Sequence, residues 1–313
     1  MIRRPSLLGA CLSEFLGTLI LVFFGVGAVN AAVLTGAQQG LWQVAVVWGV
    51  AIALAIYTTG AVSGAHINPA ITVAMAVWRG FPKSKIAPYI VAQVAGAMAG
   101  SFILYGLYHG SIFHMEAATV MRGMPGSENT AMVFGEYFPN PGTKMPAETV
   151  SVVTAMFAEA IGTAFLACFV FALTEPRNTQ TPRFMVPLFI GLTVAIIISI
   201  IAPLTQAGLN PARDFGPRLV SYILGWGSVA IPGPRGGFFT VYILSPIIGA
   251  LFGAGVYEVM VRRHLPAPGV GMEIGVEEAT VGAQGMDCMP AASHCLTGLV
   301  GSKWPGASLG GGR

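Results

Sequence analysis

Charged side chains are scarce in this sequence. Only 9% of its 313 residues are Asp, Glu, Lys or Arg, while 54% are hydrophobic and the mean hydropathy is +0.72. Soluble domains carry about 25% charged residues, so the composition predicts a polytopic membrane protein. The net charge of +3 is small and the basic residues are scattered, so a nucleic-acid partner is not predicted.

Cysteine is also rare, and disulfide frameworks belong mainly to short secreted domains. Asp287 and His294 accompany two tail cysteines, but their spacing matches no zinc pattern, so no metal and no cofactor is predicted. Two cysteines lie in apolar segments and two in the tail: Cys11, Cys168, Cys288 and Cys295.

The N-terminus has some features of a cleaved signal peptide. Arg3 and Arg4 precede an apolar run that ends in small residues near 28–32. The run is long, however, and Glu14 interrupts its start. We therefore expect it to stay in place as the first spanning helix.

Long apolar runs define the organisation, since a spanning helix needs about 20 predominantly apolar residues. Two further stretches, 68–79 and 210–222, are too short to span, and both begin at Asn-Pro-Ala. The predicted fold is an all-α membrane protein. Its six predicted spans are 7–32, 41–61, 86–108, 150–174, 184–204 and 238–261.

The remaining chain is polar or of low complexity. A Gly- and Pro-rich stretch from His109 to about Thr149 is expected to be a long loop. Residues 1–265 are predicted to form the membrane domain. The Gly-, Ala- and Ser-rich segment 266–313 is expected to be a disordered cytoplasmic tail.

Basic residues indicate the orientation, because cytoplasmic loops carry an excess of Lys and Arg. If six helices alternate, the loops on the side with fewer basic residues hold Arg122, Lys144 and Arg235. We therefore expect both termini in the cytoplasm and the chain in the inner or plasma membrane. The side with more basic residues, which we expect to be cytoplasmic, holds Arg3, Arg4, Arg79, Lys83, Lys85, Arg177, Arg183, Arg262 and Arg263.

The two halves of the chain repeat, at about 7–108 and 150–261. Glu14-Phe-Leu-Gly-Thr is echoed by Glu159-Ala-Ile-Gly-Thr, and each half has a GxxxG pattern, at 96–100 and 249–253. Such patterns let helix backbones approach closely in lipid. Because each half has three spans, an odd number, the second half must be inverted in the membrane relative to the first. Short segments at matching positions of inverted halves indicate a transport site.

Each Asn-Pro-Ala reads as a helix start. Asn is a favoured N-cap and Pro fits the first helical position. Inverted half-helices would meet near the midplane with both positive dipole ends together. The side-chain NH₂ groups of Asn68 and Asn210 would then face a lumen, where they bind neutral oxygens while the dipoles repel cations and protons.

These features resemble the major intrinsic protein family, the aquaporins, and within it the glycerol facilitator branch. The resemblance covers about residues 6–265. Its motifs are SGAHINPA (63–70), NPARDFGP (210–217), SEFLGT (13–18) and AQVAGA (92–97). It implies six spanning helices, two re-entrant half-helices and a homotetramer with one pore per subunit.

The resemblance also implies site residues. The four positions of the family's constriction correspond to Trp48, Ile198, Ala207 and Arg213. Trp48 and Arg213 match the glycerol facilitators, which have Gly and an aromatic at the other two positions. The set is closer to plant nodulin-like channels, which have Trp, Val, Ala and Arg. A Trp–Ile corner opposite Arg213 is expected to accept a polyol.

Other residues support or oppose the glycerol branch. Asp214 and Tyr108 match positions typical of it, and Asp214 is expected to pair with Arg218. In contrast, Tyr242-Ile243 stands where that branch has Pro-Leu.

Two acidic residues and one histidine lie in or beside the predicted membrane segments. Glu14 and Glu159 are expected to anchor the re-entrant loops by accepting backbone N–H groups, with a proton relay as the alternative. His66 is expected to be packed or pore-lining rather than a metal ligand.

The predicted function is passive diffusion of glycerol, other small neutral solutes and water across the lipid bilayer. A channel mainly for water or ammonia is the alternative within the class. A secondary active transporter also uses inverted repeats and broken helices, but no ion-coupling cluster is apparent. An enzyme is not predicted, because no nucleophile–base or metal-ligand set shares a face.

Overall fold

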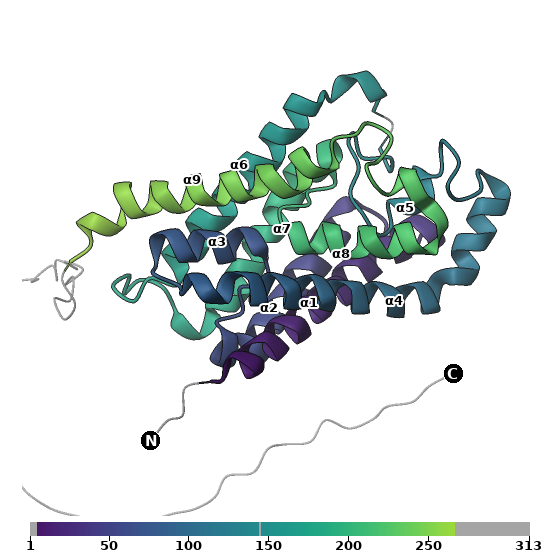
Figure 1. Ribbon diagram of the computed structural model, residues 1–313. Helices are drawn as coiled ribbons and strands as arrows, with labels where there is room; N and C mark the ends of the chain where they lie inside the picture. The colour runs from purple at the N-terminus through teal and green to yellow at the C-terminus, as the bar shows by residue number, and fades with distance from the viewer. Residues whose placement is uncertain (1–4, 144, 267–313) are drawn as a thin grey trace, which may run out of the picture. The chain divides into compact units, whose positions relative to one another are not determined.

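The computed structural model describes residues 5–143 and 145–266, and within them every regular element is a helix (Figure 1). Helices satisfy their own backbone hydrogen bonds, which lipid cannot do for them. The predicted tail disorder concerns residues beyond 266, which lie outside the described part of the chain.

Six helices in the described residues are long and apolar enough to cross a membrane, which confirms the predicted number. Ser6 caps the first and Ser151 caps the fourth through their side-chain oxygens. The helices are α1 (Leu7–Asn30) with a π-helical extension (Ala31–Thr35), α2 (Leu41–Ser63), α4 (Ile86–Ala118), α6 (Val152–Leu173), α7 (Val186–Thr205), and α9 (Ser245–Met260) preceded by a π-helical stretch (Phe239–Leu244).

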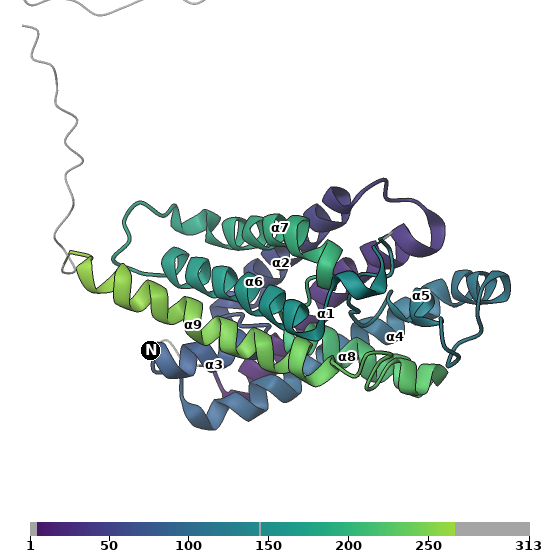
Figure 2. The ribbon, with the colours of Figure 1, turned by 90° about the horizontal axis from the view of Figure 1, so that it is seen from above.

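Two short helices lie inside the bundle. They are α3 (Pro69–Trp78) and α8 (Pro211–Ser221). Figures 1 and 2 show them end to end between the longer helices. A helix of this length is too short to cross a bilayer.

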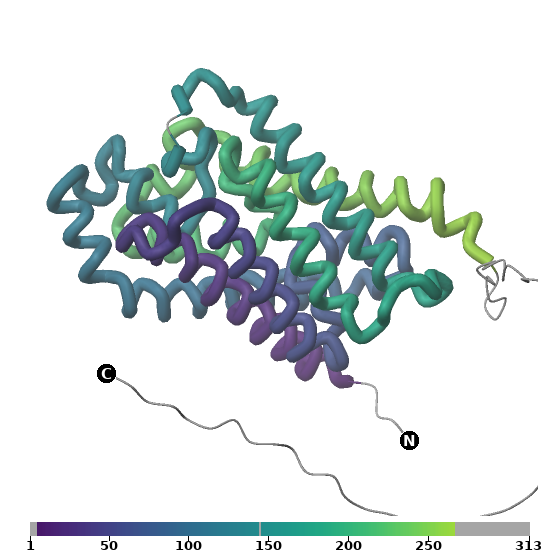
Figure 3. Tube along the Cα trace, turned by 180° about the vertical axis from the view of Figure 1, so that it is seen from behind, coloured from purple at the N-terminus to yellow at the C-terminus, as the bar shows by residue number. Residues whose placement is uncertain are grey.

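Small residues bring the backbones of equivalent helix pairs together. A side chain at Gly96 would meet the Phe15 carbonyl of α1, and one at Gly249 would meet the Ala160 carbonyl of α6. The pairs α1–α4 and α6–α9 therefore pack in the same way in the two halves. The halves join where α2 and α7 lie side by side (Figures 2 and 3), with Gly49 against Gly191.

The prediction of a long polar loop from His109 to about Thr149 is in part wrong. Helix α4 continues to Ala118, and a short helix, α5 (Glu128–Ala131), follows. Residues 130–138 are all buried. The run AMVFGEYF at 131–138 is mostly apolar, so it packs against the bundle, although Gly and Pro around it indicated an exposed loop.

A network of ion pairs closes the end of the bundle at which α3 finishes. Glu175, just after α6, pairs with Arg79 at 3.1 Å and with Arg262 at 2.7 Å. Glu258 on α9 contacts both of these arginines. The network ties the end of α3 to α6 and α9, and it was not predicted from the sequence.

Removing the charge of Glu175 is expected to destabilise the protein in a pH-dependent way. Hydrogen bonds and ion pairs with Arg262, Arg177 and Arg79 outweigh its burial and lower the pKa of Glu175 to about 2. An unfolded Glu titrates near about 4.3. The stabilisation is therefore complete above that pH and is lost as pH falls through about 2.

The measurement is the thermal unfolding midpoint of wild type and Glu175→Gln in detergent at pH 7, 4 and 2.5. The gap between the two should be largest at pH 7 and smallest at pH 2.5. Glu148→Gln, at an exposed position, is the control. Equal midpoints at pH 7 would show that the network contributes nothing to stability.

Candidate functional site

The N-terminal ends of α3 and α8 meet inside the bundle. The Asn68 side-chain oxygen accepts from Ala70 N at 2.8 Å, and the Asn210 oxygen accepts from Ala212 N at 3.0 Å. Both asparagines adopt extended backbone conformations, followed by proline at the first helical position. Each Asn-Pro-Ala therefore starts a capped helix, for the local reasons seen in the sequence.

The two asparagines also cross-link the loops. Asn68 Nδ2 donates to Leu209 O at 3.0 Å, and Asn210 Nδ2 donates to Ile67 O at 2.8 Å. The expectation that both amide groups are wholly free is therefore wrong for one hydrogen of each. Because an amide NH₂ has two donors, one per asparagine remains for another acceptor.

Glu14 contacts the loop that precedes α3. Its carboxylate accepts from His66 N at 2.9 Å, from Ile67 N at 2.7 Å and from Gln93 Nε2 at 2.7 Å. Ile67 and Ala65 have positive φ angles of 42° and 47°. A β-branched residue rarely adopts such a conformation, so the buried carboxylate holds the loop in an unfavourable shape.

Glu159 makes the equivalent contacts before α8. It accepts from Gly208 N at 2.9 Å and from Leu209 N at 2.7 Å, and Thr205 Oγ1 donates to it as well. Ala207 and Leu209 have φ angles of 61° and 54°. Glu14 and Glu159 are both completely buried, and the structure places them in the same relation to the two short helices.

A cavity of about 140 Å³ runs past the meeting point of the short helices. Asn68, Asn210 and His66 line it together with long apolar side chains such as Leu21, Ile52 and Val194. The four residues of the predicted constriction also line this cavity: Trp48, Ile198, Ala207 and Arg213.

Arg213 contacts both Trp48 and the buried segment before α6. Its guanidinium carbon lies over the Trp48 ring, 4.5 Å from the ring centroid. Its Nη1 donates to Phe134 O at 3.1 Å, and its Nη2 pairs with Glu136. Arg213 is therefore held between Trp48 and the buried segment before α6, and the apolar Trp–Ile corner for a polyol stays a prediction.

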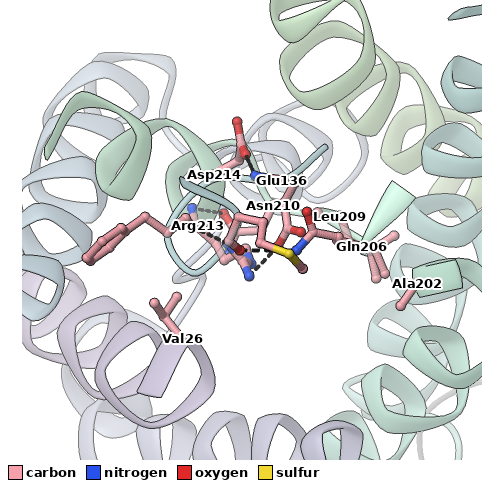
Figure 4. Close-up of polar contacts among 12 residues, drawn as sticks. Val26, Glu136, Ala202, Gln206, Leu209, Asn210, Arg213 and Asp214 are labelled. Atoms are coloured by element: carbon pink, nitrogen blue, oxygen red, sulfur yellow. Dashed lines mark hydrogen bonds and ion pairs between the residues drawn. The ribbon is translucent and has the colours of Figure 1, made fainter. Parts of the chain in front are cut away.

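Asp214 and Arg218 lie behind this constriction. Arg218 Nε donates to Asp214 Oδ2 at 2.8 Å, and both side chains are buried. Asp214 Oδ1 also accepts from Glu136 N at 2.7 Å. Figure 4 shows Glu136 and Asp214 beside Arg213 and Asn210. Tyr108 lies apart from this group, half-buried on α4 against the hydrophobic core.

Two residues near the constriction were not identified from the sequence. Glu136 contacts Arg213, and Gln206 lines the cavity and accepts from Tyr137 N at 2.8 Å. The only signal for Glu136 was an acidic residue inside an otherwise apolar run. Gln206 had no signal at all, because a polar residue at the end of a helix is ordinary.

His66 lies beside the first motif, with its Nδ1 3.2 Å from Thr72 Oγ1 and its ring packed against Phe81 and Tyr89. Residues 5–143 and 145–266 contain no group of three His, Cys, Asp or Glu side chains able to hold a metal ion. The tail set Asp287, Cys288, His294 and Cys295 lies outside those ranges.

Comparison with known families agrees with this geometry. The family model described as "Major intrinsic protein" matches residues 1–257. The chain belongs to the major intrinsic protein family.

Several members of this family are similar to the chain over most of its length. A glycerol uptake facilitator protein of Pseudomonas aeruginosa is 44% identical over 265 residues, covering 84% of this chain and 92% of its own. The glycerol uptake facilitator protein of Escherichia coli is 42% identical over 268 residues, covering 85% and 92%. A propanediol uptake facilitator of Citrobacter freundii is 42% identical over 266 residues, covering 84% and 96%.

A solved structure of the family has a similar fold. The aquaglyceroporin from Plasmodium falciparum superposes with a TM-score of 0.71 at 25% identity, covering 82% of this chain and 98% of its own. With six apolar helices, the chain is a multi-pass membrane protein of the major intrinsic protein family.

Proposed function

We propose that this protein is a passive channel for glycerol and other small neutral solutes, with water also passing, and that it catalyses no reaction. The observation that carries the proposal is that Trp48, Asn68, Asn210 and Arg213 all line one cavity. The names of the relatives, which are facilitators of glycerol and propanediol uptake, support the solute class.

The midplane of the pore is proposed to lie at Asn68 and Asn210. Each keeps one amide hydrogen after capping and cross-linking, so a hydroxyl oxygen passing both can accept two hydrogen bonds. The N-termini of α3 and α8 carry partial positive charge at the same place. Cations and protons are repelled there, while a neutral solute is not.

The selectivity filter is proposed to consist of Trp48, Ile198, Ala207 and Arg213. An arginine has five N–H donors, and those not used by Phe134 and Glu136 can bind a solute hydroxyl. The apolar side chains suit the carbon backbone of a polyol. Relative to a filter with Gly and an aromatic, Ile198 and Ala207 exchange the small and the large side chain.

Glu14 and Glu159 are proposed to anchor the two re-entrant loops, on the strength of the backbone N–H groups that they accept. Asp214 and Arg218 are proposed to hold the outer loops open as a buried pair. Tyr108 and Asp214 remain markers of the glycerol branch.

The assembly and location are proposed from the family and the charge distribution. We infer a homotetramer with one pore per subunit, in the inner or plasma membrane, with both termini cytoplasmic. The channel domain is proposed to be 1–265, with 266–313 as a cytoplasmic tail.

The function is tested by stopped-flow light scattering on proteoliposomes, with glycerol and with sorbitol as osmolytes. Glycerol should enter much faster than into protein-free liposomes, without saturation and without an ion gradient. Fast water movement with glycerol no faster than in protein-free liposomes would favour the water channel. Saturation at low glycerol with dependence on an ion gradient would favour a carrier.

Enlarging the filter side chain is expected to close the pore to glycerol. Ile198→Trp fills the cavity beside Trp48 and Arg213, so glycerol permeability should fall at least about tenfold, well beyond the roughly twofold scatter of unrelated changes. Ile200→Trp is the matched control, because Ile200 lies on the same helix at 72% exposure, away from the cavity. Equal glycerol permeability in the two variants would show that Ile198 is not in the filter.

A further inference from the structure

Glu136 is a buried carboxylate in contact with the arginine of the proposed filter. Its residue is 1% exposed and Arg213 is 5% exposed, and the two form an ion pair. Its backbone is fixed by α8, because Glu136 N donates to Asp214 Oδ1 at 2.7 Å and Arg218 Nη2 donates to Glu136 O. The side chain therefore starts from a defined position next to Arg213.

The Glu136 carboxylate has unfilled hydrogen-bond acceptor capacity. Among the residues that the structure describes, neither oxygen of Glu136 has a hydrogen-bond partner, apart from the ion pair with Arg213. Buried polar atoms normally have a partner, and leaving one unsatisfied is costly. Glu136 does not line the cavity that Trp48 and Arg213 line. It lines a second cavity of about 340 Å³ with Tyr137 and Arg218, so it reaches the proposed filter only through Arg213.

The carboxylate is not needed to hold its own segment in place. Asn30 Nδ2 donates to Val133 O at 2.9 Å, and Gln206 Nε2 donates to Met132 O at 3.2 Å. Gln206 Oε1 accepts from Tyr137 N at 2.8 Å. With these bonds on both sides of Glu136, its side chain is available for another role.

We propose that Glu136 is a positioning residue of the filter, whose ionised carboxylate occupies donors of Arg213 and balances its charge. This inference rests on the proposed channel function. The consequence is a filter whose arginine has fewer free donors and therefore releases a passing oxygen quickly. The cation barrier is then carried mainly by the ends of α3 and α8.

The contact between Glu136 and Arg213 is expected to depend on pH. Burial raises the pKa of Glu136 to about 8, with Asp214 and Glu159 acting in the same direction and Arg213 and Arg218 opposing. Glu136 therefore loses its charge as pH falls through about 8, which leaves Arg213 without its counter-charge. We expect water permeability to decline over that range.

The test compares wild type, Glu136→Gln, Arg213→Val and the double variant in proteoliposomes at pH 9, where Glu136 is ionised, normalised to incorporated protein. Glutamine keeps the shape but not the charge. In Glu136→Gln, freed Arg213 donors hold each passing water longer, so water permeability should fall by about three- to tenfold, the size of one typical net hydrogen bond. In the Arg213→Val background the same change should have an effect within about twofold.

Two further measurements exclude a merely structural role. Glu136→Asp, which keeps the charge, should restore part of the lost permeability, and the decline of water permeability below about pH 8 should vanish in Glu136→Gln. Glu148→Gln, an exposed carboxylate of the same outer segment, is the charge-matched control and should behave as wild type.

The outcomes separate this inference from the proposed function. If wild type conducts neither water nor glycerol faster than protein-free liposomes, the channel function itself fails. If wild type conducts and Glu136→Gln is unchanged, the filter role of Glu136 is wrong. An equal loss in the Arg213→Val background would show that Glu136 acts through the fold and not through Arg213.

Discussion

Replacing Glu159 by alanine is expected to abolish most glycerol conduction. The change leaves the backbone N–H groups of Gly208 and Leu209 and the Thr205 hydroxyl without their buried acceptor. Each unsatisfied buried group costs about 1–3 kcal/mol, which is enough to release the loop from its positive-φ conformation. Asn210 and Arg213, which follow directly, would then lose their positions, and glycerol permeability should fall at least about tenfold.

The measurement combines stopped-flow glycerol uptake with the thermal unfolding midpoint in detergent. Both should fall for Glu159→Ala, and Glu14→Ala should behave similarly because its contacts are equivalent. Glu148→Ala is the exposed control. A Glu159→Ala protein with wild-type conduction and midpoint would show that the loop holds its shape without the carboxylate.

Glu159→Gln separates the anchor from the alternative of a proton relay. Glutamine keeps one acceptor oxygen but cannot titrate. If Glu159 is an anchor, Glu159→Gln should keep a substantial part of the glycerol conduction, and Glu159→Ala should lose it. Complete loss in both variants, with unchanged thermal stability, would instead favour the relay.

The second large effect is expected at a helix crossing. A side chain at Gly253 would run into the backbone of Ala164 on α6. Backbone atoms cannot give way as a flexible side chain can, so Gly253→Leu should cost at least about 3 kcal/mol, the upper end for overpacking. We expect α6 and α9 to separate, so that most of the Gly253→Leu protein does not fold.

Size-exclusion chromatography of detergent extracts measures this loss. Gly106→Leu is the matched control, since Gly106 also lies within a spanning helix but has open space around it. It should elute as wild type does. Normal elution of Gly253→Leu would mean that the α6–α9 pair can separate locally without unfolding.

Local patterns predicted the elements correctly because their causes are local. Hydrophobic length alone gives the six spans, and Asn-Pro-Ala gives the start of α3 and α8, since capping needs only neighbouring residues. The GxxxG patterns likewise indicated close helix contacts, which Gly96 and Gly249 make. The failure at α4 was a boundary error, because a helix that extends beyond a membrane need not remain apolar.

Contacts between distant parts of the chain could not be predicted in the same way. The sequence by itself determined the membrane class, the repeat of the two halves and the two capped short helices, because each depends on spacing along the chain. Only the tertiary structure decided that Glu136 contacts Arg213 and that Glu175 pairs with Arg79 and Arg262. These partners are far apart in sequence, and the pairs form only because helix packing buries their charges side by side.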